Sequence, residues 1–145
     1  MRAIVQRVKE AVVSVDGQEI SRIKAGFLIL LAVKVGDTEI QAKKMAEKIA
    51  KLRIIEDGEG KLNLSLIDKQ EAVLLVSQFT LYGDCSQGNR PSFIVSARPE
   101  QAQPLFDLVV SEIRNFGLET ATGSFGAYMQ VSLVNDGPTT LILEI

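Results

Sequence analysis

The 145-residue sequence contains no histidine and no tryptophan, and Cys85 is its only cysteine. Without histidine, the chain cannot form a Ser–His or Cys–His pair, and it lacks the side chain that most often serves as a general base. A single cysteine allows no intrachain disulfide and no zinc site built from cysteines within one chain. Any chemistry must therefore use carboxylates, hydroxyls, backbone amides or groups of the substrate itself.

Long hydrophobic runs are also missing from the sequence. The longest, residues 26–33, has the length of a strand and falls short of the roughly 20 residues that a membrane-spanning helix needs. The first residues, M-R-A-I-V-Q-R-V, place arginines within an apolar pattern, which is typical of a strand and not of a signal peptide. We therefore expect a cytoplasmic protein without a membrane partner.

Neither sign of charge dominates the chain, because 18 acidic and 16 basic residues give a formal net charge of −2. Proteins that bind nucleic acids tightly and without sequence preference usually carry more basic than acidic residues. The balance therefore provides no global attraction to phosphate groups, although it leaves room for a local basic patch.

The 46% share of hydrophobic residues supports a core, and the length is that of a single domain, residues 1–145. Asp16-Gly17 between two β-rich runs predicts a hairpin, because both central residues of its turn need positive φ angles. The capping pattern Thr38-x-x-Gln41 predicts a helix N-terminus, and a second helix is expected between Pro99 and Gly117. Strands are expected at residues 2–8, 11–15, 18–24, 26–35, 53–56, 62–66, 72–80, 127–134 and 139–145.

Two helices cannot supply the repeated crossovers of a doubly wound parallel sheet. We therefore expect an α+β fold, in which a largely antiparallel, curved sheet or barrel carries two packed helices. Pro104 falls within the second helix, so that helix is expected either to begin near this residue or to kink there.

The apolar run A-V-L-L-V at residues 72–76 ends in hydrogen-bonding side chains. Ser77, Gln78 and Thr80 follow the run, with Phe79 between them. In a continuing strand, Ser77 and Phe79 point to one face, and Gln78 and Thr80 point to the other. The pattern S-x-x-T is common, and spacing alone favours a strand that leaves the core with its hydroxyls bonded to nearby backbone.

The segment N-D-G-P-T-T, residues 135–140, is the second polar motif. Glycine and proline are ordinary turn residues, so the simplest interpretation is a β-turn between two strands. About 5–6% of X-Pro bonds in folded proteins are cis. Sequence alone therefore favours a trans bond between Gly137 and Pro138.

Taken together, these stretches resemble the D-aminoacyl-tRNA deacylase family. The resemblance rests on S-Q-F-T-L-Y-G-D from residue 77, on N-R-P-S-F from residue 89, and on T-G-S-F-G-A-Y-M-Q-V-S-L-V-N-D-G-P-T-T at residues 122–140. It extends from Met1 to Ile145 and implies the deacylase fold. It further implies a homodimeric enzyme that needs no cofactor or metal and hydrolyses the ester of D-aminoacyl-tRNA and of mischarged glycyl-tRNA.

The resemblance also assigns site residues. Ser77, Gln78, Phe79 and Thr80 would form the catalytic strand end, with the backbone N–H of Phe79 facing the oxyanion. Gly137-Pro138 would form a cis peptide that enters the active site of the partner subunit, where its carbonyls reject L-side chains. Thr80 would orient the substrate's amino group or act as a nucleophile, and the ribose 2′-OH of the tRNA would help to activate water.

Two other functions fit the same residues. The chain could be a non-catalytic dimeric module that binds a small molecule or an RNA end in the same groove. A general esterase with a serine or threonine nucleophile is a third reading, but the chain lacks both a G-x-S-x-G motif and histidine.

Overall fold

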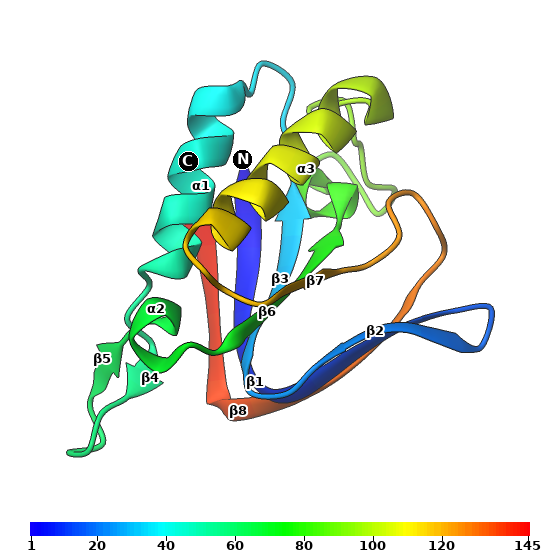
Figure 1. Cartoon of the computed structure of the whole chain (residues 1–145). Coiled ribbons are helices and arrows are strands. Elements are labelled where there is room, and N and C mark those ends of the chain that lie inside the picture. Colours follow the sequence, from blue (N-terminus) through cyan, green and yellow to red (C-terminus); the bar gives the residue numbers. More distant parts are fainter.

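The long strand β1 organises the sheet of the computed structural model, which describes all 145 residues (Figure 1). One edge of β1 pairs first with β3 and then with β2, and its other edge pairs with β8, always in the antiparallel sense. Beyond β3, the strands β6 and β7 join in parallel. The bounds are β1 Arg2–Val15, β2 Gln18–Ile23, β3 Gly26–Ala32, β4 Ile55–Glu56, β5 Leu62–Leu64, β6 Ala72–Ser77, β7 Thr120–Thr122 and β8 Gln130–Glu144.

Local signals located the first hairpin and the first helix correctly. Asp16 and Gly17 have φ angles of 50° and 76° and join β1 to β2, which confirms the predicted turn. The N–H of Thr38 donates to Gln41 Oε1 at 2.9 Å, which confirms the capping box before α1 (Glu39–Ala50). Both signals act over a few residues, so no distant contact is needed to fix them.

The second helix, α3 (Pro99–Asn115), begins at Pro99 and passes through Pro104. Proline removes the hydrogen bond that residue 104 would donate to the carbonyl of Glu100. Both residues are exposed, so water can satisfy that carbonyl. The sequence left two outcomes open, a helix that begins near Pro104 and a helix that kinks there. The first is wrong, because α3 begins at Pro99.

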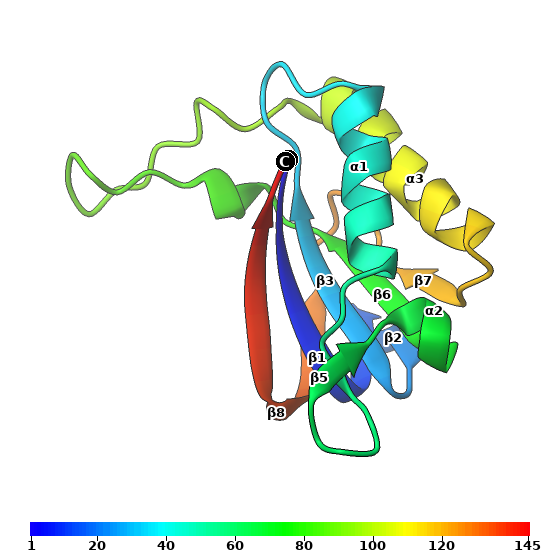
Figure 2. The same ribbon diagram turned by 90° about the vertical axis from the view of Figure 1, so that its left-hand side faces the viewer.

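Two apolar cores lie on opposite faces of the sheet. Helices α1 and α3 lie side by side over one face of the sheet (Figure 1, Figure 2), where Phe27 and Ile29 of β3 belong to the larger core. Leu28 and Leu74 belong to a smaller core on the other face, where the sheet curls so that β2 contacts β6 and β7. The mostly antiparallel, curved sheet and the two packed helices agree with the predicted α+β class.

Several predicted boundaries are wrong. Residues 2–8 and 11–15 belong to one strand, β1, and residues 130–144 form one strand, β8, where two strands and a turn were expected. The extended segment at residues 62–66 is shorter than predicted, because Ser65 caps the single-turn helix α2 (Leu66–Lys69). No helix of the chain has both the length and the apolar character needed to cross a membrane.

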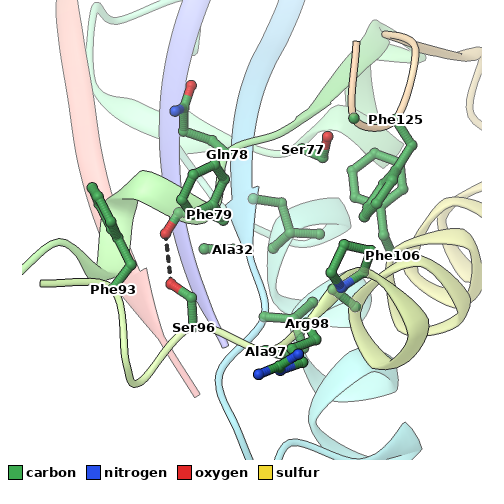
Figure 3. A pocket seen from close by; sticks show the side chains of 15 residues that line it. Ala32, Ser77, Gln78, Phe79, Phe93, Ser96, Ala97, Arg98, Phe106 and Phe125 are labelled. Atoms are coloured by element: carbon green, nitrogen blue, oxygen red, sulfur yellow. Dashed lines mark hydrogen bonds between the residues drawn. The ribbon is translucent and has the colours of Figure 1, made fainter.

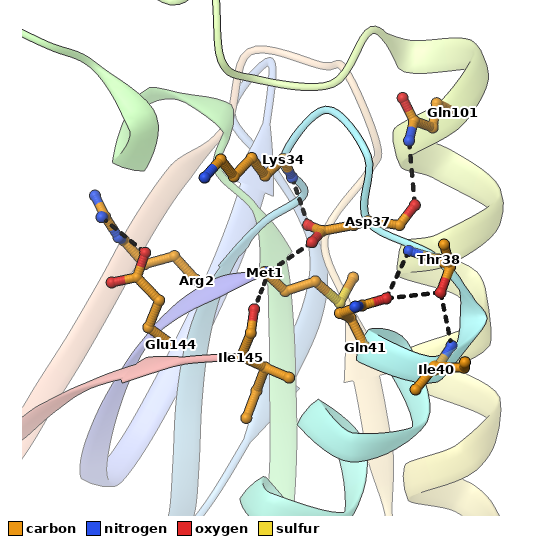
Figure 4. Close-up of polar contacts among 10 residues, drawn as sticks. All are labelled: Met1, Arg2, Lys34, Asp37, Thr38, Ile40, Gln41, Gln101, Glu144 and Ile145. Carbon is orange, nitrogen blue, oxygen red and sulfur yellow. Dashed lines mark hydrogen bonds and ion pairs between the residues drawn. The ribbon is translucent and has the colours of Figure 1, made fainter.

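Asp37 ties together the turn between β3 and α1 (Figure 4). Its carboxylate accepts from the N–H of Lys34 at 2.6 Å and from the amino group of Met1 at 3.0 Å. Its carbonyl accepts from Nε2 of Gln101 in α3 at 3.2 Å. One residue thus links β1, β3 and α3 at the end of the sheet where β3 and β6 both finish.

Candidate active site

The polar end of β6 is a turn and not a continuing strand. Strand pairing stops at Ser77, although the N–H of Gln78 still donates to the carbonyl of Leu31 at 2.8 Å. Gln78 then adopts φ −144° and ψ 75°, and the 3₁₀ turn η1 (Phe79–Tyr82) follows. The prediction that Gln78 and Thr80 share one face of a strand is therefore wrong. Their side chains nevertheless meet, because Gln78 Nε2 donates to Thr80 Oγ1.

Phe79 is the first residue of η1, so its N–H has no acceptor within that turn. The next peptide is anchored, because Ser96 Oγ donates to the carbonyl of Phe79 at 2.9 Å (Figure 3). An unpaired amide beside an anchored peptide can donate to a negatively charged oxygen. Ser96 was not recognised in the sequence, since its partner lies 17 residues away along the chain.

A cavity of about 430 Å³ opens beside Ser77, Gln78 and Phe79 (Figure 3). Fifteen residues line it, and they come from the ends of β3 and β6, from η1, from α3 and the segment before it, and from the segment after β7. Four of the six phenylalanines of the chain are among them, namely Phe79, Phe93, Phe106 and Phe125. They form two edge-to-face pairs, Phe79–Phe93 with centroids 5.1 Å apart and Phe106–Phe125 with centroids 5.8 Å apart. Such a lining suits a flat, aromatic group.

The lining holds no carboxylate and no lysine, and Arg98 is its only charged residue. Tyr82, the last residue of η1, does not line the cavity, and its hydroxyl is buried without a hydrogen-bond partner. Burial, followed by the nearby charges of Asp37 and Glu144, raises the pKa of Tyr82 to about 12. Tyr82 therefore stays protonated near neutral pH, and no side chain of the cavity is suited to act as a general base.

Gly137 and Pro138 lie in a bulge of β8. Between the pairs Gln6–Thr140 and Val8–Asn135, one residue of β1 faces four residues of β8, 136–139. The Gly137-Pro138 peptide is cis, as the resemblance implies and against the expectation from turn statistics. Asn135 closes the base of the bulge, because its Oδ1 accepts from the N–H of Thr139 at 2.9 Å.

Arg7, the β1 residue that faces the bulge, is almost completely buried. Its Nη1 donates to the carbonyl of Ile54 at 2.8 Å, and its Nη2 donates to Glu56 Oε1 at 3.1 Å. Its Nε donates to the carbonyl of Asp136 at 3.2 Å. Sequence reasoning missed Arg7, although a signal existed. Arg7 is a charged residue in register with the inward-facing Ala3 and Val5 of the same strand.

The structure does not bring the bulge and the polar strand end together within one chain. Neither Gly137 nor Pro138 lines the cavity. Ser77 pairs with Leu31, and Leu31 pairs with Ala3 of β1. The bulge lies opposite Arg7, four residues farther along β1, which corresponds to roughly 13 Å.

The model of the family described as D-Tyr-tRNA(Tyr) deacylase matches residues 4–144 of the chain. D-aminoacyl-tRNA deacylase from Brevibacillus brevis is 52% identical over 144 residues, covering 99% of each chain. The enzyme of the same name from Thermus aquaticus is 53% identical and covers 99% of this chain and 95% of the relative.

Two solved structures share the fold. One, titled c-Myc DNA Unwinding Element Binding Protein, has a TM-score of 0.93 and 42% identity and covers 100% of this chain and 99% of its own. The other, titled as a probable eukaryotic D-amino acid tRNA deacylase, has a TM-score of 0.86 over 99% of this chain and 98% of its own. At 16% identity, the second supports the fold alone.

Proposed function

The chain belongs to the D-Tyr-tRNA(Tyr) deacylase family, and on that premise we propose that it hydrolyses the ester of D-aminoacyl-tRNA. The products are a free D-amino acid and a tRNA with a free 3′ end, and mischarged glycyl-tRNA is a second substrate. The observation that carries the proposal is the phenylalanine-lined cavity beside a strand end whose amide is free to donate.

The cavity suits the terminal nucleoside of the tRNA. Proteins recognise unpaired bases largely by stacking them on aromatic side chains. A base among Phe79, Phe93, Phe106 and Phe125 would leave its ribose near the end of β6. The ester on that ribose would then lie against Ser77 and the amide of Phe79.

The reaction needs little from side chains. An aminoacyl ester is already activated, so catalysis requires an aligned water and a stabilised oxyanion. Water adds to the ester carbonyl, the Phe79 N–H donates to the resulting oxyanion, and collapse releases the carboxylate and the ribose hydroxyl. The neighbouring 2′-OH of the ribose accepts a proton from the attacking water and passes its own proton to the departing ribose oxygen, so it relays the proton as histidine does in other hydrolases.

Thr80 serves as a positioning residue in this scheme. Its hydroxyl accepts a hydrogen bond from Gln78 Nε2 and has no adjacent base that would convert it into a nucleophile. The Gln78–Thr80 pair instead holds the amino group of the substrate. A general esterase with a threonine nucleophile would form an acyl-enzyme, whereas this scheme forms none.

The chirality filter comes from a second copy of the chain. We assign it to Gly137-Pro138, whose carbonyls would occupy the space that an L-side chain needs. The roughly 13 Å between the bulge and the level of Ser77 along β1 supports an approach from a partner subunit. The outward side chains of Val134 and Ile142 in β8 are 46% and 69% exposed and offer apolar surface for that contact. The single domain of residues 1–145 would thus act as a homodimer with shared active sites, in the cytoplasm.

The test is hydrolysis of matched D-Tyr-tRNA, L-Tyr-tRNA and Gly-tRNA, each with and without a chelator. Loss of the D-tyrosyl and glycyl esters alone, unaffected by the chelator, is expected. Equal loss of the D and L esters would contradict the filter. Tight binding of D-Tyr-tRNA without ester loss would contradict the hydrolase and favour a binding module.

A further inference from the structure

Arg98 is the one charged residue in an otherwise uncharged cavity, and its side chain has no partner. It appears in no ion pair and in no side-chain hydrogen bond of the chain, whereas five of the seven arginines bond to a carboxylate, an amide or a carbonyl. Arg90 is the other arginine without a partner, and it does not line the cavity. Figure 3 places Arg98 at the end of the cavity opposite Ser77 and Gln78.

The backbone that carries Arg98 is held firmly. The N–H of the preceding Ala97 donates to the carbonyl of Val33 at 3.0 Å. The carbonyl of Arg98 accepts from the N–H groups of Gln101 and Ala102 at 3.0 and 2.8 Å, which begins α3. The backbone of Arg98 is therefore ordered before a ligand binds, and the remaining ordering cost is that of its side chain.

The position of Arg98 matches the far side of the nucleoside assigned to the cavity. A 3′-terminal nucleoside carries its ester at the 3′ or 2′ oxygen and its phosphodiester at the 5′ oxygen. With the ester beside Ser77, the 5′ oxygen of the same ribose points away from Ser77, and its phosphodiester leaves toward the side of the cavity where Arg98 lies. A guanidinium is well suited to a phosphodiester, since two of its N–H groups can donate to the two free oxygens.

We propose that Arg98 binds the phosphodiester that joins the terminal nucleoside to the preceding nucleotide. This proposal rests on the proposed function, and it gives the site a preference for esters carried by RNA over esters of a free nucleoside. An exposed arginine without a partner contributes little to folding, so its replacement is expected to leave stability unchanged.

The experiment compares two esters of D-tyrosine, D-Tyr-tRNA and D-tyrosyl-adenosine, which lacks the phosphodiester. For Arg98→Gln, kcat/KM with D-Tyr-tRNA is expected to fall roughly tenfold, mainly through KM. With D-tyrosyl-adenosine, kcat/KM is expected to fall far less, because this ester has no phosphodiester for Arg98 to bind. Arg98→Lys should recover part of the loss, and the control Arg90→Gln should resemble the wild type with both esters.

Equal losses with both esters would overturn the proposal, because a structural defect or a contact to the nucleoside would then explain them. Unchanged kinetics with D-Tyr-tRNA would overturn it as well.

A binding measurement separates this proposal from the proposed function. The dinucleotide cytidylyl-(3′→5′)-adenosine and free adenosine are titrated against the wild type and Arg98→Gln at several salt concentrations. The wild type is expected to prefer the dinucleotide, with a salt slope steeper by about 0.7 than that of Arg98→Gln. If the dinucleotide is preferred only when Arg98 is present and neither ester is hydrolysed, the phosphodiester site is supported and the proposed hydrolase activity is refuted. Hydrolysis of D-Tyr-tRNA without such a preference would refute this site alone.

Discussion

Arg7 and Asp136 face each other across the bulge of β8, with Arg7 Nε 3.2 Å from the carbonyl oxygen and 3.4 Å from Oδ2 of Asp136. The same guanidinium reaches Ile54 and Glu56, so one buried cation connects the bulge to β4 and the residue before it. The position of Gly137-Pro138 is therefore set by the pairs that β1 and β8 form before and after the bulge, and by the side chain of Arg7, which is itself fixed to Ile54 and Glu56.

Arg7→Met is expected to lower the free energy of unfolding by about 2–4 kcal/mol, because the carbonyls of Ile54 and Asp136 lose their donor in a buried place. Denaturant unfolding measures the change. Lys9→Met is the matched control, since Lys9 also pairs with Asp136, at 3.6 Å, but is 71% exposed. It is expected to cost less than about 1 kcal/mol. Similar small losses in both variants would show that Arg7 does not support the bulge.

Gly137→Ala tests whether the shape of the bulge controls chirality. Gly137 has φ +128°, and a Cβ there would lie 2.5 Å from Thr139 Oγ1. We expect a loss of about 1–3 kcal/mol in unfolding free energy and measurable hydrolysis of L-Tyr-tRNA. Gly88→Ala is the control, because Gly88 has φ +139° with no atom near its Cβ position. It should leave the ratio of D to L hydrolysis unchanged, and a wild-type ratio in Gly137→Ala would exclude the bulge as the filter.

Thr80→Ala is expected to reduce kcat/KM for D-Tyr-tRNA about ten- to hundredfold while leaving the fold intact, because one hydrogen bond to a charged amino group is lost. Residual hydrolysis is expected because the Phe79 amide and the ribose hydroxyl remain. Complete loss with unchanged substrate binding, together with an acyl-enzyme in the wild type detected by mass spectrometry, would instead establish Thr80 as the nucleophile.

The stability of the chain should depend on pH through Glu71. Burial raises the pKa of this half-buried carboxyl above its ordinary value of 4.5. The folded state then binds the proton more tightly than the unfolded state, so this contribution is complete below about pH 4.5 and is lost as pH rises through the folded pKa. In Glu71→Gln, the unfolding free energy is expected not to decline over this pH range. Glu119→Gln, which removes an exposed carboxyl, should keep the decline. An identical pH profile for Glu71→Gln and the wild type would contradict the shift.

The parts of the fold that sequence reasoning predicted well are those that neighbouring residues decide. The turn at Asp16-Gly17 and the cap at Thr38 need only local backbone and side-chain groups. The motif at Ser77 was found, but its geometry was not, because the hydroxyl of Ser96 anchors the turn from another segment. The bulge could not be predicted from the sequence either, because it depends on a hydrogen bond from Arg7 to Asp136, which lies 129 residues away along the chain.

The four-residue bulge opposite Arg7 has a consequence for mutational tolerance. A filter made of main-chain carbonyls cannot be altered by exchanging the side chains around it, since every amino acid carries the same carbonyl. If Gly137-Pro138 forms the proposed filter, the residues whose replacement would damage it are those that set the backbone path, namely Gly137, Pro138 and the anchors Arg7 and Asn135. Random mutagenesis of β1 and β8 should therefore give few variants that accept L-esters, and those variants should cluster at these four positions.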